Sequence, residues 1–236
     1  MKCVLLCAGY ATRLYPLTRN TPKALLDVAG KPILNHILDR VRAAGITDIH
    51  LVTNDLFLKH FQLWNRHGVQ IVNDGTRSNE ERLGALRDLQ LVIDQTGVDD
   101  ILLIAGDNLF GFDLSQFISL SEQAKSSIVA LHDLGSPAKA ANKFGVAVLD
   151  KKNRIVSFEE KPAHPKSALA ATCCYVLRKK SVLQLAHYLE HPTGENPGDF
   201  IRWLAEREDV YGFSFTEHWF DIGTLESLEA ARQVIA

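Results

Sequence analysis

The chain has 236 residues, of which 46% are hydrophobic, and this size suits one large α/β domain with a sizeable core or at most two small domains. The net charge of −2 provides no broad basic field, which argues against nucleic acid or a membrane surface as partners and favours a small substrate. No apolar stretch approaches the roughly 20 residues of a membrane span, and Met1-Lys2 leads straight into a strand instead of a signal peptide. We therefore expect a cytoplasmic protein, and the sequence leaves open whether it forms a homo-oligomer.

The cysteines do not indicate a zinc site. Cys3, Cys7, Cys173 and Cys174 form no C-x-x-C pair, and all four lie inside apolar runs. We expect them to be buried, reduced thiols.

The first part of the chain alternates between strand and helix patterns. Residues 3–7, 49–53 and 69–72 are short apolar runs typical of buried strands. Between them, one helix with an apolar stripe begins near Pro32, and a second helix is expected at residues 56–66. Strands that alternate with helices form parallel sheets covered on both faces, so we expect a largely parallel sheet flanked by helices.

The loop after the first strand combines small residues with two cations. Ala8, Gly9 and Ala11 let backbone amides approach a ligand closely. Arg13 adds a planar guanidinium group, and Lys23 adds a positively charged ammonium group. A polyphosphate needs these groups, so the loop predicts a nucleoside triphosphate site. The alternative is an ordinary surface loop with two solvated cations.

Residues 101–105 form the most uniformly apolar run of the chain and predict a central strand, which is followed directly by Gly106 and Asp107. A carboxylate at the carboxyl end of a central parallel strand lies where open α/β sheets bind ligands, and aspartate is a hard oxygen ligand that suits Mg²⁺. Asp107 is therefore a candidate metal ligand. The alternative is an aspartate that caps the following turn.

Further patterns predict local structure. Residues 144–158 are typical of a β-hairpin, and the charged run that follows at residues 159–162 would ordinarily be a solvated edge. Ser181 and Gln184 predict a capping box at the start of a helix, and Thr224 predicts the N-cap of the terminal helix. Asn79 precedes another amphipathic helix, where it is either a ligand contact or an N-cap.

The first loop resembles the signature of the sugar-1-phosphate nucleotidyltransferases, L-A-G-G-x-G-T-R-L-x-P-L-T followed by P-K. The chain matches this signature at Leu6, Gly9, Thr12, Arg13, Leu14, Pro16, Leu17, Thr18, Pro22 and Lys23. Ala8 and Ala11 stand where the family most often has glycine, and because alanine resists positive φ we expect a slightly different loop path. Later segments are similar to the family's G-D, F-G-V, E-K-P, T-G-x-Y and W-x-D-I-G-T elements, in family order. They are Gly106-Asp107, Phe144-Gly145-Val146, Glu160-Lys161-Pro162, Thr172-Cys173-Cys174-Tyr175 and Trp219-Phe220-Asp221-Ile222-Gly223-Thr224.

The resemblance implies a role for each matching residue. Arg13, Lys23 and Asp107 would be catalytic, and Asp107 and Asp221 would hold Mg²⁺. The nucleotide would be bound by Leu6, Ala8, Gly9, Tyr10, Ala11, Thr12, Arg13, Asn79, Gly84 and Asp107, with Asn79 and Gly84 at the nucleobase. The sugar phosphate would be bound by Asn108, Gly145, Glu160, Lys161 and Thr172. Cys173 replaces a family glycine and fills space beside the sugar, which leaves the identity of the sugar open.

The resemblance covers essentially the whole chain and implies a Rossmann-like nucleotide-diphospho-sugar transferase fold. Its mixed, mostly parallel central sheet would be flanked by helices, with a β-hairpin insertion that covers the sugar site. We expect a single domain, residues 1–236, in which residues 1–110 bind the nucleotide and residues 111–236 bind the sugar phosphate. No C-terminal β-helix domain is expected.

The implied activity is the Mg²⁺-dependent condensation of a nucleoside triphosphate, expected to be dTTP or UTP, with a hexose 1-phosphate to give an NDP-sugar and pyrophosphate. Guanylyl or cytidylyl transfer to another phosphorylated small molecule stays open. A non-catalytic regulatory relative would be expected to lack at least one of Arg13, Lys23, Asp107, Lys161 and Asp221, and all five are present. An NAD-dependent oxidoreductase is disfavoured because Gly9 is the only glycine of the first loop. A glycosyltransferase would normally carry D-x-D, where this chain has Asp107-Asn108-Leu109.

Overall fold

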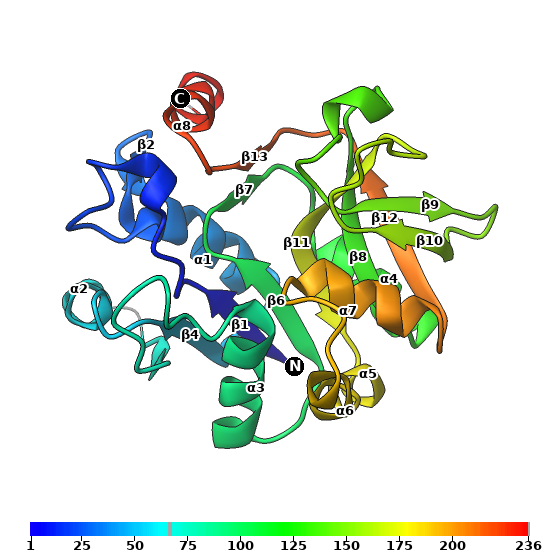
Figure 1. Cartoon of the computed structure of the whole chain (residues 1–236), viewed down its shortest axis with the longest axis horizontal. Helices are drawn as coiled ribbons and strands as arrows, with labels where there is room; N and C mark the ends of the chain where they lie inside the picture. The colour runs from blue at the N-terminus through cyan, green and yellow to red at the C-terminus, as the bar shows by residue number, and fades with distance from the viewer. Residues whose placement is uncertain (66–67, 236) are drawn as a thin grey trace. The chain divides into compact units, whose positions relative to one another are not determined.

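The computed structural model describes residues 1–65 and 68–235. The chain forms two compact units, which Figure 1 shows with the elements labelled. The first unit comprises Met1–Gly97, Ile104–Gly111 and His218–Ala236, and the second comprises Val98–Leu103 and Phe112–Glu217. The last segment of the chain therefore returns to the first unit, so the units do not coincide with the halves 1–110 and 111–236. The assignment of nucleotide and sugar phosphate to those halves stays a prediction.

The first unit is built on parallel strands. Strand β1 (Lys2–Leu6) pairs in parallel with β4 (Ile49–Thr53), and β4 pairs in parallel with β5 (Gln70–Asn73). On its other side β1 neighbours β6 (Ile101–Ala105), whose residues are divided between the two units. The helices of this unit are α1 (Ile33–Ala43), α2 (Leu58–Trp64), α3 (Ala85–Thr96) and α8 (Leu225–Val234). Short 3₁₀ helices and strands complete it: η1 (Thr12–Leu14), η2 (Lys23–Leu25), β2 (Asp27–Val28), β3 (Lys31–Pro32), β7 (Asn108–Phe110) and β13 (Trp219–Asp221).

The second unit holds a mixed sheet. Strand β8 (Ser127–Asp133) pairs antiparallel with β11 (Leu169–Leu177) and parallel with β12 (Val210–Phe215). The predicted hairpin is confirmed as β9 (Val146–Leu149) and β10 (Ile155–Glu159), and β9 also pairs with β11. The remaining elements are α4 (Leu114–Ala124), η3 (Pro137–Lys139), α5 (Lys179–Val182), α6 (Leu185–Glu190) and α7 (Pro197–Ala205).

The C-terminal segment is fastened to the first unit by backbone pairing. Strands β7 and β13 are antiparallel, and Asp221 lies opposite Asn108. The Ile222 amide donates to the Asp107 carbonyl at 3.0 Å. In Figure 1 the red helix α8 lies beside the blue β2, where Arg232 Nε donates to the Asp27 carbonyl at 3.0 Å. Segments that lie far apart in the sequence are thereby held side by side.

The predicted N-cap at Thr224 is confirmed, since its hydroxyl caps α8 by accepting from the Ser227 amide. At the C-terminal end of α1, Gly45 follows the helix with a φ of 80°. The expected helix at residues 56–66 runs from Leu58 to Trp64, and residue 66 lies outside the described residues. Within residues 1–65 and 68–235, no helix combines the length and apolar character that a bilayer crossing requires.

The predicted capping box of Ser181 and Gln184 is wrong. Ser181 is buried inside α5, and its hydroxyl is bonded to Ser127 Oγ at 2.7 Å and to the Glu208 carboxylate. Gln184 itself stands at the N-cap of α6, where its side chain makes no capping hydrogen bond. The prediction is wrong because the Ser181 hydroxyl is hydrogen-bonded to Ser127 in β8 and to Glu208, which lie far from it in sequence.

Candidate active site

The loop after β1 has the backbone that a ligand-binding turn needs. Ala8 and Tyr10 are buried while Gly9 is exposed. Ala11 adopts the left-handed conformation with φ 50° and ψ 40°, although alanine resists it. The Ala11 carbonyl accepts from the Leu14 amide at 3.0 Å and from the buried Thr18 hydroxyl at 2.8 Å. These hydrogen bonds hold the left-handed turn from which Thr12 and η1 begin.

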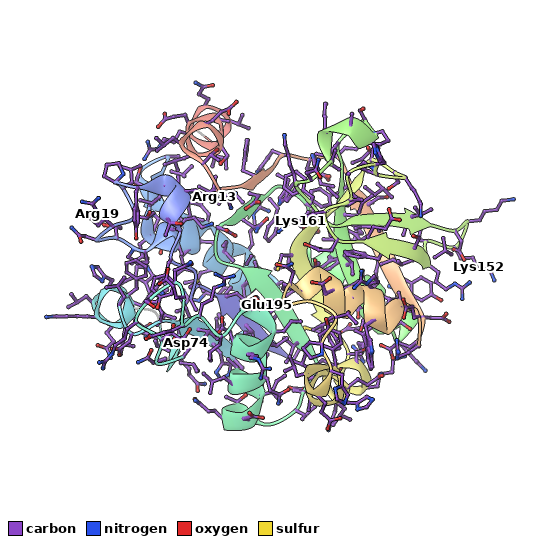
Figure 2. The ribbon with its side chains drawn as sticks, in the orientation of Figure 1. Arg13, Arg19, Asp74, Lys152, Lys161 and Glu195 are labelled. Carbon is purple, nitrogen blue, oxygen red and sulfur yellow. The ribbon has the colours of Figure 1, made fainter. Side chains whose placement is uncertain are left out.

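The two cations of the loop are placed in different ways. Arg13 lies in η1 with its side chain exposed (Figure 2), and its guanidinium is close to Gly223, where an added Cβ would lie 3.4 Å from Nη2. Lys23 follows Pro22 at the start of η2, and its ammonium group donates to the Asp107 carboxylate. Both side chains of this ion pair are 19% exposed, so the pair is partly shielded from water. The loop thus reaches both Asp107 and the segment that carries Asp221.

A chain of hydrogen bonds orients Asp107. Its Oδ2 accepts from Lys23, and its Oδ1 accepts from Asn108 Nδ2 at 2.9 Å. Asn108 Oδ1 in turn accepts from the Trp219 indole N–H at 2.6 Å, across the β7–β13 pair. Asn108 is 3% exposed, so its side chain is committed to Asp107 and Trp219. This geometry makes Asn108 a residue that positions Asp107, and its contact with the sugar phosphate stays a prediction.

Gly106, which the sequence identified only as part of the G-D element, is required by the packing of the strands. A Cβ at this position would collide with Cys7 Sγ and would lie 3.1 Å from the Leu6 carbonyl, which accepts from the Gly106 amide. Only glycine lets the ends of β6 and β1 approach this closely. A small pocket opens there, lined by Leu6, Cys7, Gly9, Lys23, Ala24, Gly106 and Asp107.

The donor set at this place fits a magnesium ion. Asp107 precedes β7 and Asp221 ends β13, in register with Asn108, so the two aspartates lie on neighbouring stretches of backbone in the first unit. Mg²⁺ is usually held by one or two carboxylates together with substrate phosphates and water. Among residues 1–65 and 68–235 there is no cluster of three or more acidic, histidine or cysteine side chains able to hold a metal alone. An ion at this place would therefore depend on the two aspartates and on a bound phosphate.

The residues expected near the base lie around the start of α3. Gly84 is the N-cap of this helix with a φ of 88°, a conformation that favours glycine. Asn79 therefore does not cap the helix but lies in the loop before it, where its carbonyl accepts from Arg82. Tyr10 is tied to Thr76 by a 3.0 Å hydrogen bond between their hydroxyls, a link that the sequence did not predict.

The second unit brings three of the sugar-phosphate residues together. The Lys161 amide donates to the Phe144 carbonyl, which places Lys161 beside Gly145, and Lys161 Nζ lies 3.9 Å from Glu160 Oε1. A Cβ on Gly145 would come within 2.8 Å of Glu160 Oε2, and a Cβ on Gly198 would collide with the same oxygen. Burial raises the pKa of Glu160, and the neighbouring Lys161 ammonium partly opposes this effect. Gly198, at the start of α7, was not predicted to belong to this group.

The Thr172 side chain is buried and hydrogen-bonded to β8, and its contact with the sugar phosphate stays a prediction. It is 2% exposed, and its hydroxyl donates to the Ala130 carbonyl at 3.1 Å. The next residue, Cys173, has a left-handed φ of 53° at an irregularity in the β8–β11 pairing. Cys173 is only half-buried, in contrast to the expectation that all four cysteines are buried, and Cys3, Cys7 and Cys174 are buried as expected. All four are free thiols.

Known proteins resemble the chain along its whole length. A family model described as nucleotidyl transferase matches residues 2–236. The bifunctional protein GlmU of Methanocaldococcus jannaschii is 31% identical over 225 residues, which are 94% of this chain and 51% of that protein. A glucose-1-phosphate thymidylyltransferase of Streptomyces griseus is 30% identical over 246 residues, covering all of this chain and 66% of the relative. The chain thus spans about half the length of the GlmU relatives that it matches.

Solved structures share the fold. A Bacillus anthracis protein, named provisionally as a glucose-1-phosphate thymidylyltransferase and solved with sucrose, matches 99% of this chain and 94% of its own with a TM-score of 0.84 and 27% identity. A UDP-glucose pyrophosphorylase complexed with UDP-glucose gives a TM-score of 0.85 at 21% identity, covering 99% of this chain and 97% of its own. The mixed, mostly parallel sheet with flanking helices is therefore the Rossmann-like nucleotide-diphospho-sugar transferase fold that the sequence predicted. As the resemblance to sugar-1-phosphate nucleotidyltransferases indicated, this chain belongs to the nucleotidyl transferase family.

Proposed function

We propose that the protein condenses a nucleoside triphosphate with a sugar 1-phosphate to give an NDP-sugar and pyrophosphate. The observation that carries this proposal is the arrangement around Asp107, which Lys23 and Asn108 hold at the pocket beside the first loop, next to the strand that ends at Asp221. The family match and the similarity to a thymidylyltransferase support it. The expected substrates are dTTP or UTP and a hexose 1-phosphate.

The reaction needs little proton chemistry from the protein. An oxygen of the sugar 1-phosphate attacks the α-phosphorus, a new P–O bond forms, the bond to the β-phosphate oxygen breaks, and pyrophosphate leaves with the electron pair. Because the nucleophile is already an anion, no general base is required. The task of the protein is to bring two anions together and to stabilise the charge that develops.

Each charged residue then has a defined task. The exposed Arg13 guanidinium would bind the departing pyrophosphate through its planar fork. Lys23 donates one hydrogen bond to Asp107 and has further N–H donors for the α-phosphate. Lys161, whose side chain is half exposed, would hold the sugar phosphate, and Glu160 would accept hydrogen bonds from sugar hydroxyls. Asp107 and Asp221 would hold Mg²⁺, which neutralises phosphate charge when bound.

Pyrophosphate release over a panel of triphosphates and sugar 1-phosphates tests the proposal. We expect release with at least one pair, and Lys161→Met should raise the KM for the sugar phosphate by about 10- to 100-fold because a charge-assisted contact is lost. Lys152→Met is the matched control, since Lys152 lies exposed at the tip of the β9–β10 hairpin (Figure 2). If no pair yields pyrophosphate, the proposed reaction is wrong.

A further inference from the structure

Asp88 is a buried acid that the proposed reaction does not use. It lies in the first turn of α3 and is 6% exposed. Its Oδ1 is buried without a hydrogen-bond partner among the residues that the structure describes. Burial, and secondarily the nearby Asp74, raise the pKa of Asp88 to about 7. A leucine would avoid the cost of burying an unpartnered carboxyl group, so packing alone gives no reason for an acid here.

The position of Asp88 directs its carboxyl group towards the start of α3. The Asp88 amide donates to the Gly84 carbonyl at 3.0 Å, so the two residues are one helical turn apart on the same face. Helical side chains tilt towards the N-terminus, and therefore Asp88 leans back over Gly84. Gly84 has no side chain with which to cover the carboxyl group. The acid thus faces the loop where a base contact is expected.

The groups near Asp88 come from loops at the carboxyl ends of parallel strands. Asp74 follows β5, and Figure 2 labels it there; its Oδ1 accepts from the Thr76 amide at 2.7 Å and from the Thr76 hydroxyl at 2.8 Å. The Thr76 hydroxyl is also bonded to Tyr10, in the loop after β1. In open α/β sheets ligands bind at this edge. Asp74, which acts electrostatically on Asp88, therefore belongs to a group of linked polar side chains at the edge where a nucleotide would lie.

We propose that the Asp88 carboxyl group reads the edge of the nucleotide's base. This inference rests on the proposed function, because it requires a nucleotide in the first unit. A neutral carboxyl group offers one O–H donor and one carbonyl acceptor, which complement a base edge that carries a donor beside an acceptor. The bound base supplies the partner that Oδ1 lacks among the described residues. The affinity for a triphosphate without a base should therefore not depend on Asp88.

The test compares nucleotides with inorganic tripolyphosphate by titration calorimetry of the full chain. The probes are dTTP, UTP, CTP, GTP and ATP, and the variants are Asp88→Leu and the near-isosteric Asp88→Asn. We expect Asp88→Leu to lower the affinity for the preferred nucleotide by about tenfold or more and to reduce the difference in affinity between bases. The affinity for tripolyphosphate should not change. Asp88→Asn, which keeps a donor and an acceptor, should restore most of the affinity. Asp94→Asn is the control, since Asp94 is exposed on the same helix, where its carboxylate accepts from Gln90.

The pH dependence gives a second measurement that a purely structural role would not change. The nucleotide affinity of the unmodified protein should fall above pH 7, as Asp88 loses its donor, while that of Asp88→Asn stays level. Asp74 acts on Asp88 from the loop after β5, and Asp55 acts on Asp74, so the comparison with Asp88→Asn isolates the single group.

Three outcomes overturn the inference. If Asp88→Leu lowers the affinity for tripolyphosphate as much as the affinity for nucleotides, Asp88 supports the fold of the loop and does not contact the base. If Asp88→Leu folds and leaves all nucleotide affinities unchanged, Asp88 is not in the base site, and the proposed function still stands. If the unmodified protein binds neither nucleotides nor tripolyphosphate, the proposed function fails together with this inference.

Discussion

At the scale of single residues, the site depends on buried polar groups that orient one another. Asp107 is held on one oxygen by Lys23 and on the other by Asn108, and Asn108 is held by Trp219. Partners of this kind fix the orientation of a metal ligand, and their loss typically lowers the affinity for the metal by about 10- to 100-fold. Asn108 and Trp219 are therefore as much a part of the candidate site as the carboxylates.

Replacing Trp219 by phenylalanine tests this orientation. The change removes the indole N–H and leaves Asn108 Oδ1 without this donor, so Asp107 should lose its fixed direction. We expect the affinity for Mn²⁺, used as a probe ion in the presence of nucleotide, to fall by about tenfold or more. Titration calorimetry measures this affinity, and Trp203→Phe serves as the control because Trp203 lies in α7 of the second unit. Equal Mn²⁺ affinities in both variants would show that Trp219 does not act through Asp107.

A second residue-scale prediction concerns the two alanines of the first loop. Ala11 has a φ of 50°, whereas Ala8 has no positive φ. Glycine adopts the left-handed conformation without the penalty that alanine incurs, so Ala11→Gly should raise the free energy of unfolding by about 1 kcal/mol. Ala8→Gly should lower it by about 0.5–1 kcal/mol, because the unfolded chain gains freedom. Urea denaturation compares the two variants, and a loss of stability in both would mean that Ala11 is not strained.

At the scale of elements, the start of α7 shapes the candidate sugar site. Pro197 and the Asn196–Asp199 capping box fix where this helix begins, and this places Gly198 against the Glu160 carboxylate just after β10. Gly145, just before β9, also lies close to the Glu160 carboxylate. Two glycines from different segments therefore make room for one acid, and neither can gain a side chain without moving it.

Gly198→Ala tests this arrangement. The new methyl group collides with Glu160 Oε2, so the carboxylate must turn away from the position where it would meet sugar hydroxyls. We expect the KM for the sugar phosphate to rise about tenfold, with the KM for the triphosphate unchanged, because one charge-assisted hydrogen bond is lost. Lys152→Ala, at an exposed position of the same unit, is the control. A rise in the KM for both substrates would instead indicate general damage to the fold.

At the scale of the whole molecule, the stability should depend on pH through Asp88. Its pKa of about 7 in the folded chain lies above the ordinary value of 3.8, so the folded state keeps a proton that the unfolded state releases. Because of this group, the free energy of unfolding decreases as the pH rises from about 4 to about 7. Above pH 7 the contribution of the group stays constant. Relative to Asp88→Asn, the loss should be a few kcal/mol, because a tenfold change in proton affinity corresponds to about 1.4 kcal/mol.

Urea denaturation of the protein and of Asp88→Asn between pH 4 and pH 8 measures this difference. The two curves should diverge as the pH rises, because only the unmodified chain must bury a charge above pH 7. Parallel curves over this range would show that the carboxyl group of Asp88 has the same proton affinity in the folded and unfolded chains.

Much of the candidate site could be predicted because its signals are local in the sequence. The first loop, the hairpin of β9 and β10 and the Thr224 cap each depend on a few consecutive residues, and the structure contains all three. The order of the motifs pointed to the family. A local pattern failed where a polar residue is bonded to a partner that is distant in sequence: Ser181 is bonded to Ser127 and does not cap a helix.

By itself, the sequence determined the alternation of strands and helices and the family of the chain, since periodicity, caps and small-residue turns act over a few residues. That the first loop binds phosphate stays a prediction. Only the tertiary structure decided that residues 218–236 return to the first unit, that Asn108 positions Asp107 through Trp219, and that Asp88 Oδ1 is buried without a partner among the described residues. The reason is physical: burial and the pairing of buried polar groups depend on which segments meet in space, and 111 residues separate Trp219 from Asn108.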